Sequence, residues 1–222
     1  MQIATNGQFG AAYASVGGGA LTPLSAIVCN GVTVWSAAHT VYYVVAGKAY
    51  AETRTMGADC LNPTSFSFAA VVPGATFEGW SETPGVANIL GSKTMGTSDI
   101  TLYAVYTYNN YLIDGTGTIN AEAGEHGSNG FTRYLDGAKY HAITFSYNIE
   151  VWSGGGGSWL RVKNAAGTNL FEATNDNYQG AGNVSLPYPQ MCTIEGHCWQ
   201  DDEGGARCKI YDATVYGRRC VG

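Results

Sequence analysis

The sequence predicts an all-β protein in which a small β module precedes a β-sandwich or jelly-roll domain. Charged residues make up only 13 % of the chain, about half of the ~25 % usual in soluble domains. Glycine occurs 31 times and tyrosine 15 times, which is typical of short strands joined by tight turns. No stretch keeps a helical repeat of apolar residues. The length of 222 residues allows one large domain or two modest domains, each with its own core.

The first part of the chain, residues 1–39, is predicted to be an N-terminal arm followed by a hairpin, and together they would form an anchor. Residues 1–26 are rich in Gly, Ala and Ser. They are either a loose terminus or an arm that becomes ordered on a neighbour. Asn30 and Gly31 stand between two apolar runs and predict a tight turn, because both residue types tolerate positive φ.

Residues 40–108 are predicted to form one compact β unit. Strands are expected at 40–45 and 49–54 around a turn at 46–48, and again at 76–80 and 99–106. The bulky aromatics of this region, among them Trp80 and Tyr103, are interpreted as core residues.

Two motifs in this unit carry a resemblance. Gly-x-x-Phe-x-Gly-Trp at 74–80 and Ile-Thr-Leu-Tyr-Ala-Val-Tyr at 100–106 resemble the Listeria–Bacteroides repeat, over residues 40–107. That family is a small β-grasp module of surface proteins and phage structural proteins. The resemblance implies an adhesive or spacer module without an active site, in a bacteriophage virion protein. It also implies a symmetric homo-oligomer, with a trimer favoured.

Residues 109–222 are predicted to form the β-sandwich or jelly-roll domain. The segment 142–152 alternates strongly, and its apolar side chains share one face, as a half-buried strand requires. Further strands are expected at 159–162, 169–172, 184–186, 190–199 and 207–216. Trp-Leu-Arg-Val and Lys-Ile-Tyr-Asp in two of these strands make the domain similar to the jelly-roll modules of phage adhesins and carbohydrate-binding domains.

Charge and hydropathy exclude two classes of partner. The net charge is −6, and no basic cluster offers a surface for nucleic acid. No apolar run reaches the length of a membrane helix, ~18 residues. The N-terminal segment has neither the charge nor the apolar stretch of a signal peptide. We therefore expect synthesis in the host cytoplasm and a final location in the virion, without nucleic acid or membrane as a partner.

One loop is the best candidate for ligand binding. It is polar, contains a single aromatic residue and is followed by glycine: Asn175, Asp176, Asn177, Tyr178 and Gln179. An aromatic ring can stack on the apolar face of a pyranose while amides and carboxylates bind its hydroxyls. Four other aromatics are either further parts of a sugar platform or core residues: Trp152, Trp159, Tyr188 and Trp199.

The cysteines near the C-terminus allow two interpretations. If residues 202–204 top a hairpin, Cys198 and Cys208 lie directly opposite each other at a separation that permits a disulfide. Buried, reduced thiols are the alternative. Zinc binding with His197 lacks the usual paired spacing, and the acidic run 201–203 suits a solvated tip better than a calcium loop. No metal and no cofactor are expected.

Taken together, these features predict a virion protein that binds rather than catalyses. We expect a fibre, tail-tip or head-decoration subunit that contacts other virion proteins and a host-surface glycan. The glycan would bind to the C-terminal domain. One alternative is a purely structural capsid or tail component that cements its neighbours. A second is a glycan-degrading enzyme, although no paired carboxylates and no catalytic motif stand out.

Overall fold

The computed structural model divides the chain into two compact units. The first comprises Met1–Thr107 together with Arg219–Gly222, and the second comprises Tyr108–Arg218. The structure describes residues 2–5, 12–15, 22–24, 26–29, 32–152, 155–175, 180–188 and 190–222, with only the backbone described before Ala37. Almost all of the regular structure is β-strand, so the predicted all-β fold class is confirmed. No helix in these ranges is long and apolar enough to span a membrane.

Short antiparallel strands occupy the N-terminal region. The first sheet is formed by β1 (Gln2–Thr5), β2 (Ala12–Ser15) and β3 (Thr22–Leu24). Next, β4 (Ala26–Cys29) pairs with β5 (Val32–Ser36), and Cys29 lies opposite Val32. This pairing confirms the predicted hairpin. The arm predicted over residues 1–26 thus contains three paired strands, because its apolar and β-branched residues stand in short runs between the glycines.

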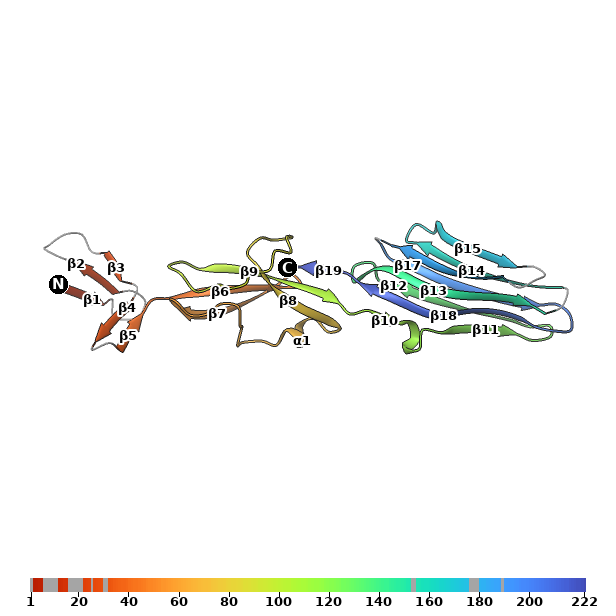
Figure 1. The fold of residues 1–222 in the computed structure, drawn as a ribbon, viewed down its shortest axis with the longest axis horizontal. Helices are drawn as coiled ribbons and strands as arrows, with labels where there is room; N and C mark the ends of the chain where they lie inside the picture. The colour runs from red at the N-terminus through yellow and green to blue at the C-terminus, as the bar shows by residue number, and fades with distance from the viewer. Residues whose placement is uncertain are drawn as a thin grey trace. The chain divides into compact units, whose positions relative to one another are not determined.

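The rest of the first unit is a five-stranded mixed sheet with one short helix (Figure 1). Its elements are β6 (Ala38–Val45), β7 (Lys48–Thr55), α1 (Phe68–Val71), β8 (Ala75–Ser81), β9 (Ile100–Tyr108) and β19 (Arg219–Val221). The sheet order is β19-β9-β6-β7, and β8 also pairs with β9. β6 and β9 are parallel. A hairpin followed by a strand parallel to its first member is the β-grasp-like arrangement predicted for this region.

Local sequence explains the hairpin of this module. Ala46 and Gly47 both have positive φ, 48° and 76°, and Val45 lies opposite Lys48. Two central residues with positive φ make the turn type whose twist suits paired strands. On β6, the side chains of Val41, Tyr43 and Val45 alternate into the core and are fully buried.

Trp80 is the centre of this core. Its side chain is 2 % exposed, its ring centroid lies 4.9 Å from that of Tyr43, and its indole N–H donates to the Leu61 carbonyl at 2.8 Å. The neighbouring Gly79 has φ of 148°, and a Cβ there would meet Ile89 Cγ2 at 2.5 Å. The predicted core role of Trp80 is confirmed, whereas Tyr103 is only partly buried.

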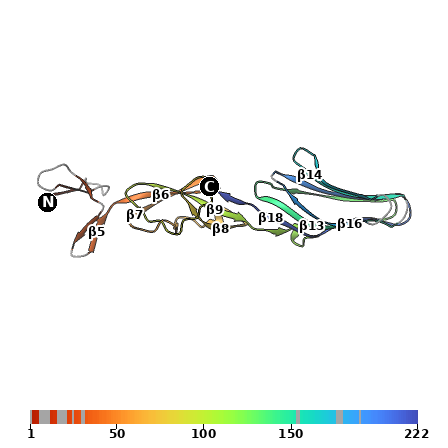
Figure 2. The ribbon, with the colours of Figure 1, turned by 45° about the horizontal axis from the view of Figure 1, so that its top comes forward.

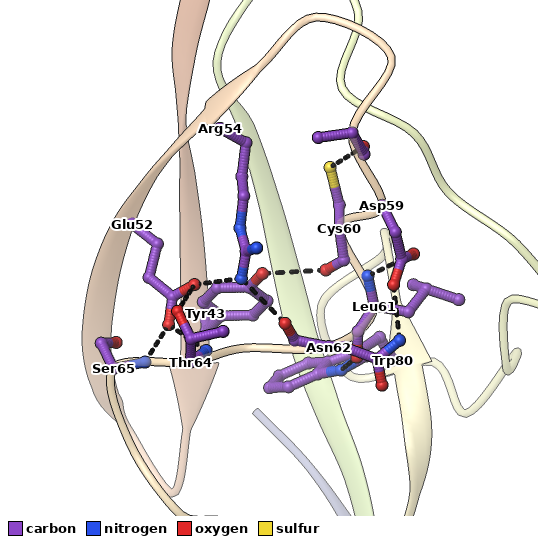
Figure 3. Close-up of polar contacts among 11 residues, drawn as sticks. Tyr43, Glu52, Arg54, Asp59, Cys60, Leu61, Asn62, Thr64, Ser65 and Trp80 are labelled. Carbon is purple, nitrogen blue, oxygen red and sulfur yellow. Dashed lines mark hydrogen bonds and ion pairs between the residues drawn. The ribbon is translucent and has the colours of Figure 1, made fainter.

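A buried carboxylate holds the loop that follows β7 (Figure 3). Glu52 is 8 % exposed and forms an ion pair with Arg54. Its carboxylate accepts hydrogen bonds from the backbone N–H groups of Thr64, at 2.6 Å, and Ser65. Burial alone raises the pKa of Glu52. The hydrogen bonds from Ser65 and Thr64 and the charge of Arg54 outweigh that effect and bring the pKa below its ordinary value. The Glu52 carboxylate therefore stabilises the loop that contains Thr64 and Ser65.

The second unit is a sandwich of two antiparallel sheets, which Figure 2 shows as two layers. The β13 sheet contains β10 (Tyr111–Leu112), β11 (Ile119–Ala123), β13 (Tyr140–Val151), β16 (Gly180–Pro187) and β18 (Ala206–Gly217). The β17 sheet contains β12 (Ser128–Leu135), β14 (Gly156–Asn164), β15 (Asn169–Asn175) and β17 (Cys192–Gln200). A single 3-10 turn, η1 (Ile113–Gly115), follows β10. The predicted β-sandwich is confirmed.

The core lies between the two sheets because alternate side chains of each strand point inward. On β13, Ile143, Phe145, Ile149 and Val151 are buried, and Tyr147 packs against them. This is the face predicted from the sequence. On β17 burial alternates residue by residue along the whole strand. Every second residue of β17 therefore faces away from the core, on the outer side of the β17 sheet.

The cysteines differ from the hairpin prediction. β17 and β18 lie in different sheets, so the segment around residues 201–205 connects two layers and does not top a hairpin. Cys198 pairs with Ser158 on β14, and Cys208 pairs with Ile149 on β13. Both side chains point into the core, and both are free thiols in the structure. The two cysteines are therefore not opposite each other on one hairpin, as the sequence predicted. The structure has two free thiols in place of the predicted disulfide.

The division of the chain differs slightly from the predicted domains. The sequence suggested boundaries after residues 39 and 108, with 109–222 as one domain. In the structure the last four residues, Arg219–Gly222, belong to the first unit. β19 pairs with β9, and Cys220 lies opposite Tyr106. A short edge strand of this kind depends on a partner far away in the sequence, so local pattern did not reveal it.

Candidate functional site

The predicted ligand loop is only partly described. Asp176, Asn177, Tyr178 and Gln179 lie outside the described residues. Asn175, at the end of β15, is 9 % exposed, and its amide donates to the Ile149 carbonyl at 3.2 Å. This bond links the two sheets of the sandwich, so Asn175 has a structural role in this unit.

The four other aromatics singled out from the sequence separate into three environments. Tyr188 is 1 % exposed and belongs to the core. Trp152 is 51 % exposed just beyond β13, where its indole N–H donates to Glu150 at 3.1 Å. Trp159 and Trp199 are brought together, on the outer face of the β17 sheet. The sequence therefore named two members of this cluster without indicating that they meet.

Strand register assembles an aromatic group on that outer face. Trp159 of β14 lies directly opposite His197 of β17. Their ring centroids are 5.8 Å apart, with planes inclined by 22°. Trp199 follows two residues later on the same face of β17, and its ring centroid lies 5.9 Å from that of His197, at 35°. We call Trp159, His197 and Trp199 the aromatic face; all three are partly exposed.

Glycines leave room for these rings. Gly157 of β14 lies opposite Trp199, and a Cβ at Gly157 would meet Trp199 Cζ2 at 2.2 Å. Gly130 of β12 lies opposite His197, and a Cβ there would meet His197 Cδ2 at 3.2 Å. Gly157, near the start of β14, therefore lies directly beneath the Trp199 indole.

The indole N–H groups distinguish the aromatic face from Trp80 and Trp152. Trp80 and Trp152 use theirs in hydrogen bonds. Within the described ranges, the N–H groups of Trp159 and Trp199 have no hydrogen-bond acceptor and are not buried. A Trp that serves only packing normally finds a partner for this group or buries the ring. These two donors are free to bind an acceptor on a ligand.

Two ion pairs lie beside the aromatic rings, on the same outer face of the β17 sheet. Arg161 donates to Glu172 at 2.6 Å, and Lys163 lies 2.7 Å from Glu195. Arg161 also places its guanidinium carbon 4.5 Å from the ring centroid of Trp159, in a cation–π contact. The hydrogen bond and charge of Arg161 lower the pKa of Glu172. These pairs hold Arg161 against Trp159 and place polar groups beside the rings.

This arrangement can bind a flat, amphipathic ligand. Exposed ring faces attract apolar C–H surfaces, while the indole N–H groups and the charged pairs bind hydroxyls at the edge. Metal chemistry has no equivalent support, because in the described parts of the chain no three His, Cys, Asp or Glu residues are grouped to hold an ion.

Comparison with known proteins finds no matching family model and no matching curated relative. Several solved structures share weak similarity. TmCBM61 in complex with β-1,4-galactotriose is 11 % identical, with a TM-score of 0.30, over 52 % of this chain and 82 % of its own. The enzymatically active domain of tailspike protein 4 from bacteriophage CBA120 is 12 % identical, with a TM-score of 0.25, over 65 % of this chain and 19 % of its own.

A third similar structure is a family 11 carbohydrate-binding module from Clostridium thermocellum, in complex with a mixed-linked tetrasaccharide. It is 12 % identical, with a TM-score of 0.23, over 65 % of this chain and 96 % of its own. At such scores the similarity assigns no function.

The signal that sequence reasoning missed is the outward alternation of two strands. Trp159, Arg161 and Lys163 alternate along β14, and Glu195, His197 and Trp199 alternate along β17. Each series shows which side chains point outward. The register that places Trp159 beside His197 joins residues far apart in the sequence, and β15 and β16 intervene between the two strands.

Proposed function

We propose that this chain is a non-catalytic glycan-binding protein of a bacteriophage virion, and that the aromatic face binds the glycan. The observation that carries the binding proposal is the pair of unbonded indole N–H groups on Trp159 and Trp199, whose ring planes are inclined to that of His197 by 22° and 35°. A sugar offers what such a surface needs, an apolar C–H face and hydroxyl acceptors at its edge.

The virion part of the proposal has a separate basis, in the first unit. Residues 40–107 resemble the Listeria–Bacteroides repeat, whose members include phage structural proteins. We propose that this unit connects the chain to other virion proteins, in a homo-oligomer, while the second unit presents the aromatic face. The core of the first unit is built from Trp80 and Tyr43, which suits a spacer or adhesive module.

Glycan binding is tested by presenting the full chain to an immobilised glycan array. We expect binding to a small set of glycans, and Trp159→Ala and Trp199→Ala should each weaken it by about tenfold or more, because aromatic residues dominate such contacts. The matched control is Trp152→Ala, which removes an exposed tryptophan whose indole N–H is already bonded to Glu150. Equal loss in all three variants, or no binding by the parent chain, would refute the role of the aromatic face.

Two further measurements separate the alternatives. If the chain cleaves the glycan that it binds, reducing ends will accumulate, and the non-catalytic part of the proposal fails. Electron microscopy of intact particles with an antibody against the second unit tests the virion location. Label at a projecting fibre, a tail tip or the head surface would support it. A chain that binds no glycan but lies among capsid or tail subunits would be a cementing component, and absence from particles would refute the virion role.

A further inference from the structure

A hollow lies on the outer face of the β13 sheet, away from the aromatic face. It has a volume of about 360 Å³, within the range of small-ligand sites, ~300–1,000 Å³. It is lined by residues of β13, β16 and β18: Thr144, Phe145, Ser146, Asn183, Val184, Ser185 and Asp212. Five of the seven side chains are polar, and none of them belongs to the aromatic face.

An irregularity in β18 places Asp212 at this hollow. Thr144 pairs with Thr214 but Ser146 pairs with Tyr211, so β18 carries one residue more than β13 between these pairs. Such a β-bulge redirects a side chain. Asp212 has φ of 55°, in the left-handed region that Asp and Asn tolerate better than most residues. The next residue, Ala213, is buried and donates its N–H to the Gly117 carbonyl at 2.9 Å, which holds the bulge in place.

The polar groups at the hollow are left open. Within the described residues, the carboxylate of Asp212 and the hydroxyl of Ser185 have no hydrogen-bond partner. Asn183 accepts from Ser146 Oγ at 2.7 Å through its Oδ1, which leaves its Nδ2 group as a donor. An open acceptor, an open amide donor and an open hydroxyl therefore line one depression.

This set of groups suits a neutral, polyhydroxylated ligand. A bound anion would be repelled by Asp212, the one charged group in the lining. A divalent cation needs several oxygen ligands, but the Asn183 oxygen is already engaged by Ser146. A sugar with adjacent hydroxyls can donate to the Asp212 carboxylate and accept from the Asn183 amide, with charge-assisted bonds to the former.

We propose that this hollow is a second saccharide site, which binds a neutral sugar unit by hydrogen bonds and without ring stacking. It lies on the opposite outer face of the sandwich from the aromatic face, so each site can be lost without the other. A chain with both sites could bind two glycan segments at once.

The test is a nuclear magnetic resonance titration of the full chain with methyl glycosides of glucose, galactose, mannose and N-acetylglucosamine, each alone. At least one should cause saturable shifts of the backbone amides of Asn183, Ser185 and Asp212. Asp212→Asn tolerates the same backbone conformation and should weaken this binding by about tenfold or more, because a charge-assisted hydrogen bond is lost. Ser185→Ala provides a second, smaller loss.

The control is Glu125→Gln, which removes one exposed carboxylate from a turn of the same unit and should leave the titration unchanged. Ethanolamine is titrated as well. Shifts caused by ethanolamine and by none of the glycosides would show a site for an ammonium group and overturn the saccharide assignment. The proposal is also overturned if no glycoside shifts these amides, or if Asp212→Asn binds as well as the parent chain.

Discussion

In the first unit, the polar side chains of Glu52 and Arg54 turn toward their own loop, whereas in the second unit Trp159 and Trp199 keep their indole N–H groups open. Glu52 is 8 % exposed and bonded to two backbone N–H groups. The two clusters contain residue types that a sequence scan would rate equally interesting. What distinguishes a structural cluster from a binding surface is whether the polar groups are already satisfied within the fold.

The largest effect should come from breaking the cluster of the first unit. Glu52→Ala leaves the Arg54 charge and the Thr64 and Ser65 N–H groups without their acceptor, and should lower the free energy of unfolding of this unit by about 3 kcal/mol. Hydrogen exchange at the β6 amides of Tyr43 and Val45 measures the change. Glu125→Ala, in the second unit, is the control. Unchanged exchange in Glu52→Ala would contradict the structural role.

Acid should weaken the first unit through the same carboxylate. The pKa of Glu52 is lowered in the folded state, so its contribution to stability is present above the unfolded pKa, about 4.5. That contribution is lost as pH falls through the folded pKa. Urea unfolding at a series of pH values should show this loss in the parent chain and less of it in Glu52→Gln. Parallel acid profiles for the two chains would argue against it.

On the aromatic face, adding one methyl group should displace a ring. Gly157→Ala places a Cβ where Trp199 Cζ2 lies, at 2.2 Å, so the indole must move and glycan affinity should fall by about tenfold, or ~1.4 kcal/mol. The matched variant is Gly124→Ala, whose added Cβ meets nothing within 4 Å. Titration calorimetry measures the glycan affinity of both variants and of the parent chain. Equal affinity in Gly157→Ala and the parent chain would show that the position of Trp199 does not matter.

The smallest effect on stability is expected from breaking an ion pair beside the aromatic face. Lys163→Met removes a partly exposed ion pair with Glu195 and should change the free energy of unfolding by less than about 1 kcal/mol. Thermal unfolding measures it. A loss of unfolding free energy as large as that expected for Glu52→Ala would mean that the Lys163–Glu195 pair, like the Glu52 carboxylate, stabilises the fold.

Local sequence pattern was sufficient for much of the fold. Alternation along residues 142–152 showed which side chains of β13 face the core, and Asn30 with Gly31 marked a hairpin that pairing confirms. The position of Trp80 in a core was also predicted, from the bulk of its aromatic side chain. These features depend on residues close together in the chain, where the period of a strand or the φ preference of a turn acts directly.

By itself, the sequence determined the all-β class, the core-facing side of β13 and the hairpin at Asn30 and Gly31. Tertiary structure alone decided that Trp159 meets His197, that Cys198 and Cys208 sit on different sheets, and that β19 returns to β9. The reason is that strand register and sheet assignment join residues far apart in the sequence. Register and sheet assignment are determined by burial of the whole core and by backbone pairing, and the local periodicity of a sequence does not reveal them.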